Sequence, residues 1–172
     1  MRKKLLWVLV ILTCGLATAI LTGCSSDDDK AEAKTEVTMN DGSVVRTADL
    51  LGQPSVVVLF SVDCPDCRHE LPEIQRLWNM NQADSLIPGQ RIPIVLIARK
   101  CTEEDIEPFW QFAELTMPYS PQPDRKVYSR FAPRVIPRIY VSDAQGIIRH
   151  MYVDIGMPTA ETIVNEIKEL KQ

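Results

Sequence analysis

The chain has 172 residues, with 19 basic and 23 acidic side chains and a formal net charge of −4 at pH 7. The excess of acidic side chains, without a basic cluster in the expected domain, argues against a nucleic-acid-binding protein. The length suits a single domain with a sizeable core, and we place that domain at residues 36–172.

Residues 1–23 are predicted to be an export signal. A basic start, Arg2–Lys4, precedes an apolar run from Leu5 to Ile20 that is short for a membrane span. Small residues then lead to Cys24, as in secretory signals. The segment resembles a bacterial lipoprotein signal, which implies a lipid on Cys24 after cleavage. The alternative is an uncleaved N-terminal anchor, and in either case the remaining chain would be exported and tethered to the membrane.

Residues 24–35 are polar and charged, and we expect them to form a flexible tether between lipid and domain. The acidic run Asp27–Asp29 resembles a surface-export signal of some Gram-negative lipoproteins, and it suits a solvated spacer equally well. The expected location is therefore the cell envelope, on the periplasmic or surface side of a membrane, with the leaflet left open.

The expected domain begins with a hairpin over Glu36–Val45, whose turn lies at Asn40–Gly42. A continuous apolar run then predicts a buried strand over 55–61. A helix is predicted over about 65–81 by apolar residues at three- and four-residue spacing. These residues are Leu71, Ile74, Leu77 and Trp78.

The rest of the chain alternates strands and helices, which predicts an α/β fold. The expected elements are a strand over 92–98 parallel to the first, a helix over about 103–115 capped by Thr102, a short helix over 124–131, strands over 138–142 and 147–153, and a final helix opened by Pro158. Aromatic side chains at helical spacing are interpreted as packing residues. They are Trp78, Phe109, Trp110, Phe112 and Tyr128.

Two cysteines, Cys64 and Cys67, lie where the first buried strand gives way to the helix. Pro65 suits the first helical turn, where its missing N–H costs little. The positive end of the helix dipole favours a thiolate on Cys64, and the thiolate is the attacking form of cysteine. Cys67 follows closely enough to form a disulfide with it. We interpret Cys64 as the nucleophile and Cys67 as the resolving thiol.

A Cys-x-x-Cys motif can also be half of a zinc site or a structural disulfide. A zinc site would need two further ligands at suitable spacing, whereas His69 lies in the same helix and His150 is isolated. The strand–motif–helix context favours a redox-active dithiol. We expect neither a metal nor another cofactor.

Several segments resemble the thioredoxin superfamily, and within it the membrane-tethered TlpA/ResA-like reductases, which border the AhpC/TSA-type redoxins. They are Asp41–Val45, Leu50–Pro54, Val57–Phe60, Cys64–Pro72 and Val135–Val141. The resemblance covers about residues 36–170. It implies a thioredoxin-like fold with a central mixed sheet, flanking helices, an N-terminal hairpin and a strand–helix insertion. One difference is Asp63, where the family usually has tryptophan.

The resemblance implies that Pro137 is the cis proline that lies against the dithiol in thioredoxin-fold enzymes. A cis proline there presents the backbone of the preceding residue, Ile136, to an extended substrate chain. Pro133 is the competing candidate, and an ordinary trans proline at a strand start is the alternative. Pro65 and Asp66, between the two thiols, complete the expected substrate contacts.

Glu70 is the remaining catalytic candidate. The resemblance implies that this carboxyl, three residues after Cys67, exchanges protons with the resolving thiol. Partial burial would raise its pKa toward the range where such exchange is efficient. The alternative is a solvent-facing carboxylate on the helix surface.

Negative charge at Asp63 and Asp66 opposes formation of the neighbouring thiolate, which predicts a reducing rather than an oxidising protein. Nearby arginines could offset this effect. They are Arg68, Arg99 and Arg138. Cys101 follows the second buried strand, and we interpret it as a small packed residue. Exchange of its thiol with the dithiol is the alternative.

These features predict an extracytoplasmic thiol–disulfide oxidoreductase, acting as a reductase of protein disulfides. The resemblance implies exported disulfide-bearing substrates, such as apocytochromes c, and a membrane electron-donor thiol protein that restores the dithiol. One alternative is a redoxin-type thiol peroxidase, less favoured because Ser61–Asp63 precedes Cys64 in place of a Thr/Pro-rich stretch. Another is a non-catalytic binding module with a structural Cys64–Cys67 bond.

Overall fold

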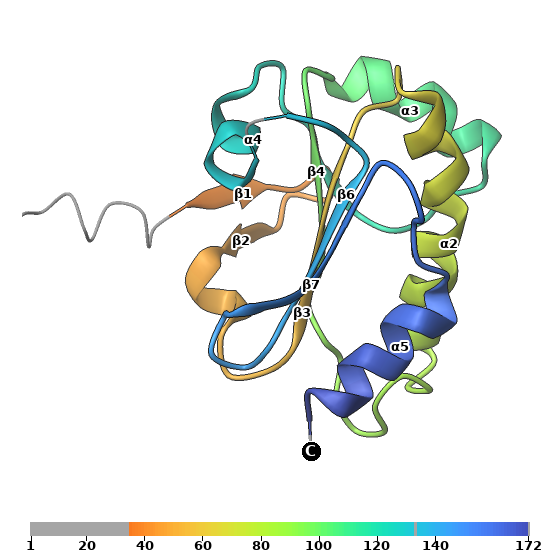
Figure 1. Cartoon of the computed structure of the whole chain (residues 1–172). Helices are drawn as coiled ribbons and strands as arrows, with labels where there is room; N and C mark the ends of the chain where they lie inside the picture. Colours follow the sequence, from red (N-terminus) through yellow and green to blue (C-terminus); the bar gives the residue numbers. More distant parts are fainter. Residues whose placement is uncertain (1–34, 133, 172) are drawn as a thin grey trace, which may run out of the picture.

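A five-stranded mixed sheet in the order β5-β4-β3-β6-β7 forms the centre of the protein (Figure 1). The computed structural model describes residues 35–132 and 134–171. The expected signal, Cys24 and all of the expected tether except Thr35 lie outside these residues. The strands are β3 Ser55–Phe60, β4 Ile94–Ala98, β5 Tyr119–Ser120, β6 Arg138–Ser142 and β7 Ile148–Val153.

The central strand β3 is buried at every residue, as its unbroken apolar sequence predicts. It pairs in parallel with β4, placing Phe60 opposite Ala98, and antiparallel with β6, placing Leu59 opposite Arg138. The carboxyl end of β3 therefore lies beside the start of β6. This register brings the segment after Phe60 next to the segment before Arg138.

Four helices flank the sheet. They are α2 Pro65–Gln82, α3 Glu103–Phe112, α4 Lys126–Phe131 and α5 Ala160–Glu169. Figure 1 shows α2 and α5 together on one side of the sheet, and α4 on the other side with the N-terminal hairpin. The hairpin consists of β1 Glu36–Thr38 and β2 Val44–Arg46, and the short 3-10 helix η2 Thr47–Leu50 follows it. The expected thioredoxin-like layout, with its hairpin and the α3–β5 insertion, is confirmed.

Threonine side chains cap the starts of two helices, α3 and α5, and one predicted helix start needs correction. Thr102 caps α3 through a complete capping box with Asp105, as predicted. The final helix begins at Ala160 rather than at Pro158, so that prediction was wrong. The hydroxyl of Thr159 accepts a hydrogen bond from the Thr162 N–H, which makes Thr159 the N-cap.

The packing role predicted for Phe112 is also wrong, because its side chain is 86% exposed. Trp110 is buried instead, with ring centroids 5.3 Å from Phe60 and 4.7 Å from Tyr119. Residues two apart on a helix point in different directions, so the face that buries Trp110 leaves Phe112 in solvent. Phe112 is the last residue of α3, and the C-cap residue after it, Ala113, packs against the core.

We expect Trp110→Ala to destabilise the protein by about 3–5 kcal/mol, because it removes a buried aromatic side chain. The substitution also leaves the Met117 carbonyl without the indole N–H that donates to it at 3.0 Å. Phe112→Ala in the same helix is the matched control, with an expected change within about 0.5 kcal/mol. Urea unfolding followed by circular dichroism measures both, and equal losses for the two variants would contradict the assignment of the core.

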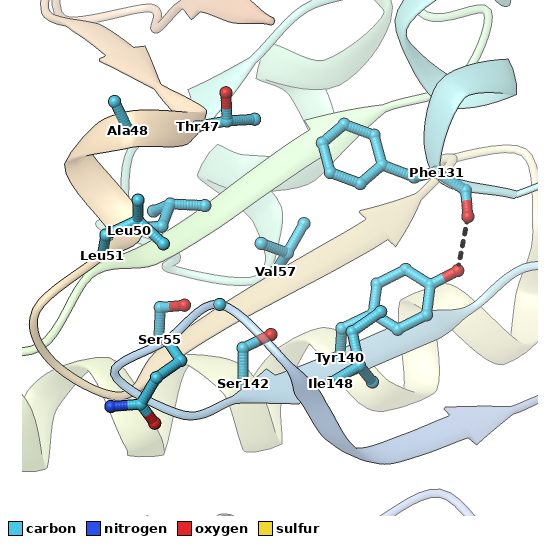
Figure 2. Close-up of a pocket in the computed structure, with 12 residues that line it drawn as sticks. Thr47, Ala48, Leu50, Leu51, Ser55, Val57, Phe131, Tyr140, Ser142 and Ile148 are labelled. Carbon is cyan, nitrogen blue, oxygen red and sulfur yellow. Dashed lines mark hydrogen bonds between the residues drawn. The ribbon is translucent and has the colours of Figure 1, made fainter. Parts of the chain in front are cut away.

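The face of the sheet opposite α2 and α5 contains an apolar hollow of about 390 Å³. Figure 2 shows Val57 and Tyr140 on the sheet side, Leu50 on the η2 side and Phe131 at one end. The Tyr140 hydroxyl donates to the Phe131 carbonyl at 2.7 Å and so fixes this end. Neither cysteine of the motif lines this hollow. None of the helices in the described part of the chain is long and apolar enough to cross a membrane.

Candidate active site

The two cysteines lie where β3 passes into α2, as the sequence predicts. Cys64 is the N-cap residue of α2, and Pro65 and Asp66 form the first positions of the helix. The Cys64 N–H donates to the Ser61 carbonyl at 3.2 Å, and the Arg68 N–H donates to the Cys64 carbonyl at 3.1 Å. The turn and the helix therefore hold the Cys64 backbone from both sides.

The two thiols differ sharply in exposure. Both are free, Cys64 is partly exposed, and Cys67 is 0% exposed. Burial holds the pKa of the Cys67 thiol far above its ordinary value, and contact with the Cys64 thiol raises it further. The Cys64 sulfur is therefore accessible from solvent, whereas Cys67 is shielded from solvent and contacts the Cys64 thiol. The roles of nucleophile and resolving thiol, which match this asymmetry, remain predictions.

The peptide bond between Ile136 and Pro137 is cis, and it lies against the dithiol. The Cys64 thiol donates to the Ile136 carbonyl across 3.7 Å. Ile136 and Pro137 are both buried, and β6 starts directly after them at Arg138. Sequence positions more than seventy residues apart thus meet at one sulfur atom. The competing proline, Pro133, lies outside the described residues.

Glu70 is buried, with 5% of its surface exposed. Its Oε1 atom has no hydrogen-bond partner among the described residues. Burial, and secondarily the charge of Glu73, raises the pKa of Glu70 from 4.5 to about 7. The carboxyl is therefore ready to gain or lose a proton near neutral pH, one helical turn from Cys67.

The raised pKa of Glu70 predicts a specific pH dependence of stability. Between pH 4.5 and about pH 7 the unfolded carboxyl has lost its proton while the folded one keeps it. Stability therefore falls as pH rises through this window, by about 3 kcal/mol for a shift of this size. Urea unfolding at several pH values measures the effect. Glu70→Gln should lack this component, and identical pH profiles for variant and parent would contradict it.

A hollow of about 420 Å³ lies beside Glu70. Asp66, His69 and Glu73 of α2 line one wall, and the loop 154–159 after β7 forms the other. This loop is tied to the cis proline, because the Asp154 N–H donates to the Pro137 carbonyl at 3.3 Å. One wall of the hollow is therefore hydrogen-bonded to the segment that faces Cys64.

The nearby arginines are held by other groups. Arg68 donates to the Val62 carbonyl and lies 5.4 Å from the Phe109 ring centroid. Arg138 donates to the Arg134 carbonyl at 2.9 Å. The charge of Arg99 lowers the pKa of Cys67, by less than burial raises it. Burial therefore dominates the electrostatics of the inner thiol.

The model of the AhpC/TSA family matches residues 28–151, well over half of the chain. The chain belongs to the AhpC/TSA family. The thioredoxin superfamily expected from the sequence, and with it the general class of thiol–disulfide redox enzymes, is confirmed at this level. No curated protein matches the chain.

Solved structures similar to this AhpC/TSA protein establish the thioredoxin fold. A thioredoxin-family thiol:disulfide interchange protein of Chlorobium tepidum is 18% identical with a TM-score of 0.65, over 81% of this chain and 94% of that one. StoA of Bacillus subtilis is 20% identical with a TM-score of 0.63, over 82% and 98%. An exposed lipoprotein thioredoxin of Streptococcus pneumoniae is 17% identical with a TM-score of 0.63, over 80% and 99%.

Cys101 is the third cysteine in the described part of the AhpC/TSA protein and is fully buried. Its sulfur is 3.2 Å from the Ser61 hydroxyl oxygen, and its backbone exchanges two hydrogen bonds with Gln122 at 2.9 Å. The backbone N–H of Ser61 also faces the Cys67 sulfur. Burial agrees with interpreting Cys101 as a packed residue, and the exchange alternative stays a prediction.

The structure adds Ser61 and Asp154 to the neighbourhood of the predicted site. Ser61 could have been noticed as a hydroxyl at the end of a buried apolar strand, where a polar group needs a partner. Asp154 carries no such signal, because only the folding of the loop 154–159 against α2 brings it near Glu70. Cys24, the expected lipidation site, lies outside the described residues.

Proposed function

We propose that this AhpC/TSA protein is an extracytoplasmic, lipid-anchored reductase of protein disulfides. The observation that carries the proposal is the partly exposed Cys64 sulfur, 3.7 Å from the Ile136 carbonyl and in contact with the buried Cys67 thiol. An extended substrate chain that pairs with the backbone at Ile136 would bring its disulfide to Cys64.

In the first step the Cys64 thiolate attacks one sulfur of the substrate disulfide. An S–S bond forms between Cys64 and that sulfur, the substrate S–S bond breaks, and the other substrate sulfur leaves as a thiolate. Cys67 then loses its proton and attacks the Cys64 sulfur. The substrate leaves with both sulfurs reduced, and the enzyme holds a Cys64–Cys67 disulfide. Two electrons have passed from enzyme to substrate.

Glu70 would take the Cys67 proton in the second step. Burial of Cys67 disfavours its thiolate, so resolution needs a nearby base, and the pKa of Glu70 near 7 suits that task. Pro137 would keep the docking segment in place, with Ile136, Pro65 and Asp66 as substrate contacts.

The remaining parts of the proposal concern location and partners. The basic and apolar N-terminal sequence ending at Cys24 supports export and lipid attachment. A structurally similar protein is described as an exposed lipoprotein thioredoxin, which agrees with this location. The proposed substrates are exported proteins with disulfides, apocytochromes c among them. A membrane electron-donor thiol protein would restore the dithiol.

Membership of the AhpC/TSA family supports a second candidate, a thiol-dependent peroxidase. In that reaction the Cys64 thiolate would attack one peroxide oxygen, the O–O bond would break, and an alcohol or water would leave. Cys64 would become a sulfenic acid, which Cys67 converts to the same disulfide with release of a further water. One experiment separates the two. Reduced protein is mixed with insulin or with hydrogen peroxide, samples are quenched with a thiol-alkylating reagent, and mass spectrometry of the protein itself follows conversion of its Cys64–Cys67 dithiol to the disulfide over time. Faster oxidation by insulin supports the reductase, and faster oxidation by peroxide supports the peroxidase.

A further inference from the structure

The hollow beside Glu70 has an acidic lining. Four carboxylates line it: Asp66, Glu70, Glu73 and Asp154. One imidazole, that of His69, also lines it, and among the described residues no lysine or arginine does. Its volume of about 420 Å³ is enough for one long side chain.

Three of these carboxylates, those of Asp66, Glu70 and Asp154, are free to interact with a cation. The fourth, Glu73, already accepts hydrogen bonds from the Ala160 N–H and from Arg76, both at 3.0 Å. Asp66 and Asp154 form no side-chain ion pair within the described part of the chain. The Oε1 atom of Glu70 is buried there without a hydrogen-bond partner. An unpartnered buried carboxylate oxygen is costly, and a bound cationic group would compensate it.

The hollow adjoins the path of the substrate. The Ile136 carbonyl faces the Cys64 thiol, and the next carbonyl, that of Pro137, accepts the Asp154 N–H. A chain that pairs with the backbone at Ile136 therefore runs past the acidic loop. Successive side chains of an extended chain point in opposite directions, so a residue close to the attacked cysteine would point into the hollow.

We propose that this hollow binds a lysine or arginine side chain of the protein substrate, close in sequence to the cysteine that Cys64 attacks. The inference rests on the proposed reductase function. The apolar stem of such a side chain would contact Met157 and Pro158, and its charged end would reach Asp66 and Asp154, close to the buried carboxyl of Glu70. No group of three metal-ligating side chains is arranged to hold an ion in residues 35–132 and 134–171, which favours an organic cation.

The test compares disulfide peptides under single-turnover conditions. Two series of disulfide-cyclised peptides are made. Each peptide of the first series carries one lysine, placed at one of the two positions on either side of one cysteine. The second series carries the neutral isostere norleucine at the same positions. The rate constant for oxidation of the reduced full-length protein is measured for each peptide. At one position we expect the lysine peptide to react about tenfold faster than its norleucine partner, with the ratio falling as salt is added.

Variants assign the effect to the hollow. Asp154→Asn should bring the lysine-to-norleucine ratio close to one, and Glu169→Gln, an exposed carboxylate of α5 outside the hollow, should leave the ratio unchanged. A ratio of one at every position in the parent protein would overturn the inference while leaving the reductase function intact. A variant that slows both peptides equally would also overturn it. If no peptide oxidises the protein, the reductase function itself fails.

Discussion

Cys64→Ser is expected to lower the rate at which the protein reduces insulin disulfides to the uncatalysed background rate. A serine hydroxyl stays protonated at neutral pH and cannot replace the thiolate that attacks a disulfide. Cys64 is the partly exposed cysteine of the three that the structure describes, so no other described sulfur can take its place. The turbidity of reduced insulin, with a dithiol as electron source, measures the loss.

Cys101→Ser is the matched control, because it replaces a buried thiol outside the Cys-x-x-Cys motif and keeps a hydroxyl for Ser61. This variant should keep its activity, and thiol titration of the oxidised parent protein should find Cys101 still reduced. Full activity of Cys64→Ser would point instead to a non-catalytic binding module. A strong loss in Cys101→Ser would show that the third thiol takes part in exchange.

Cys67→Ala is expected to stop the reaction at the mixed disulfide between Cys64 and the substrate. Cys67 contacts Cys64 and lies beneath it in the protein, so its removal leaves the mixed disulfide without an internal attacking group. The adduct should accumulate to near one equivalent and disappear on addition of a reductant. Mass spectrometry under non-reducing conditions measures it, and the same experiment with cell-envelope extracts identifies the partners.

The double variant Cys64→Ser/Cys67→Ala should form no adduct. If Cys67→Ala alone turns over repeatedly without accumulating an adduct, then another thiol resolves the intermediate. Cys101 would then be the first candidate, since it contacts the Ser61 hydroxyl, and the Ser61 backbone N–H faces the Cys67 sulfur. A Cys67→Ala/Cys101→Ser variant tests this directly.

The segment from β3 to α2 could be predicted because each of its signals is local. A continuous apolar run, Pro65 at a helix start and apolar residues at helical spacing all lie within thirty residues. The capping box of Thr102 could be predicted for the same reason. These features could be predicted from the sequence because each depends only on residues that are neighbours along the chain.

The surroundings of the site could not be predicted, because they depend on contacts between distant segments. Glu70 is as compatible with a solvent-facing helix position as with a buried one, and the fold decides between the two. Asp154 joins the site through the folding of the loop 154–159 against α2, where its N–H also donates to the Pro137 carbonyl. The error at Phe112 has a similar cause, since helical spacing shows which residues share a face and not which face packs against the core.

The difference in exposure between the two motif thiols has a consequence for the durability of the protein. Oxidation to sulfinic and sulfonic acids follows thiolate character and solvent access, so irreversible damage begins at the outer sulfur. Cys67 protects Cys64 whenever it closes the disulfide before a second oxidant arrives. The lifetime of the protein under oxidative stress therefore depends on how quickly its own inner thiol can be deprotonated.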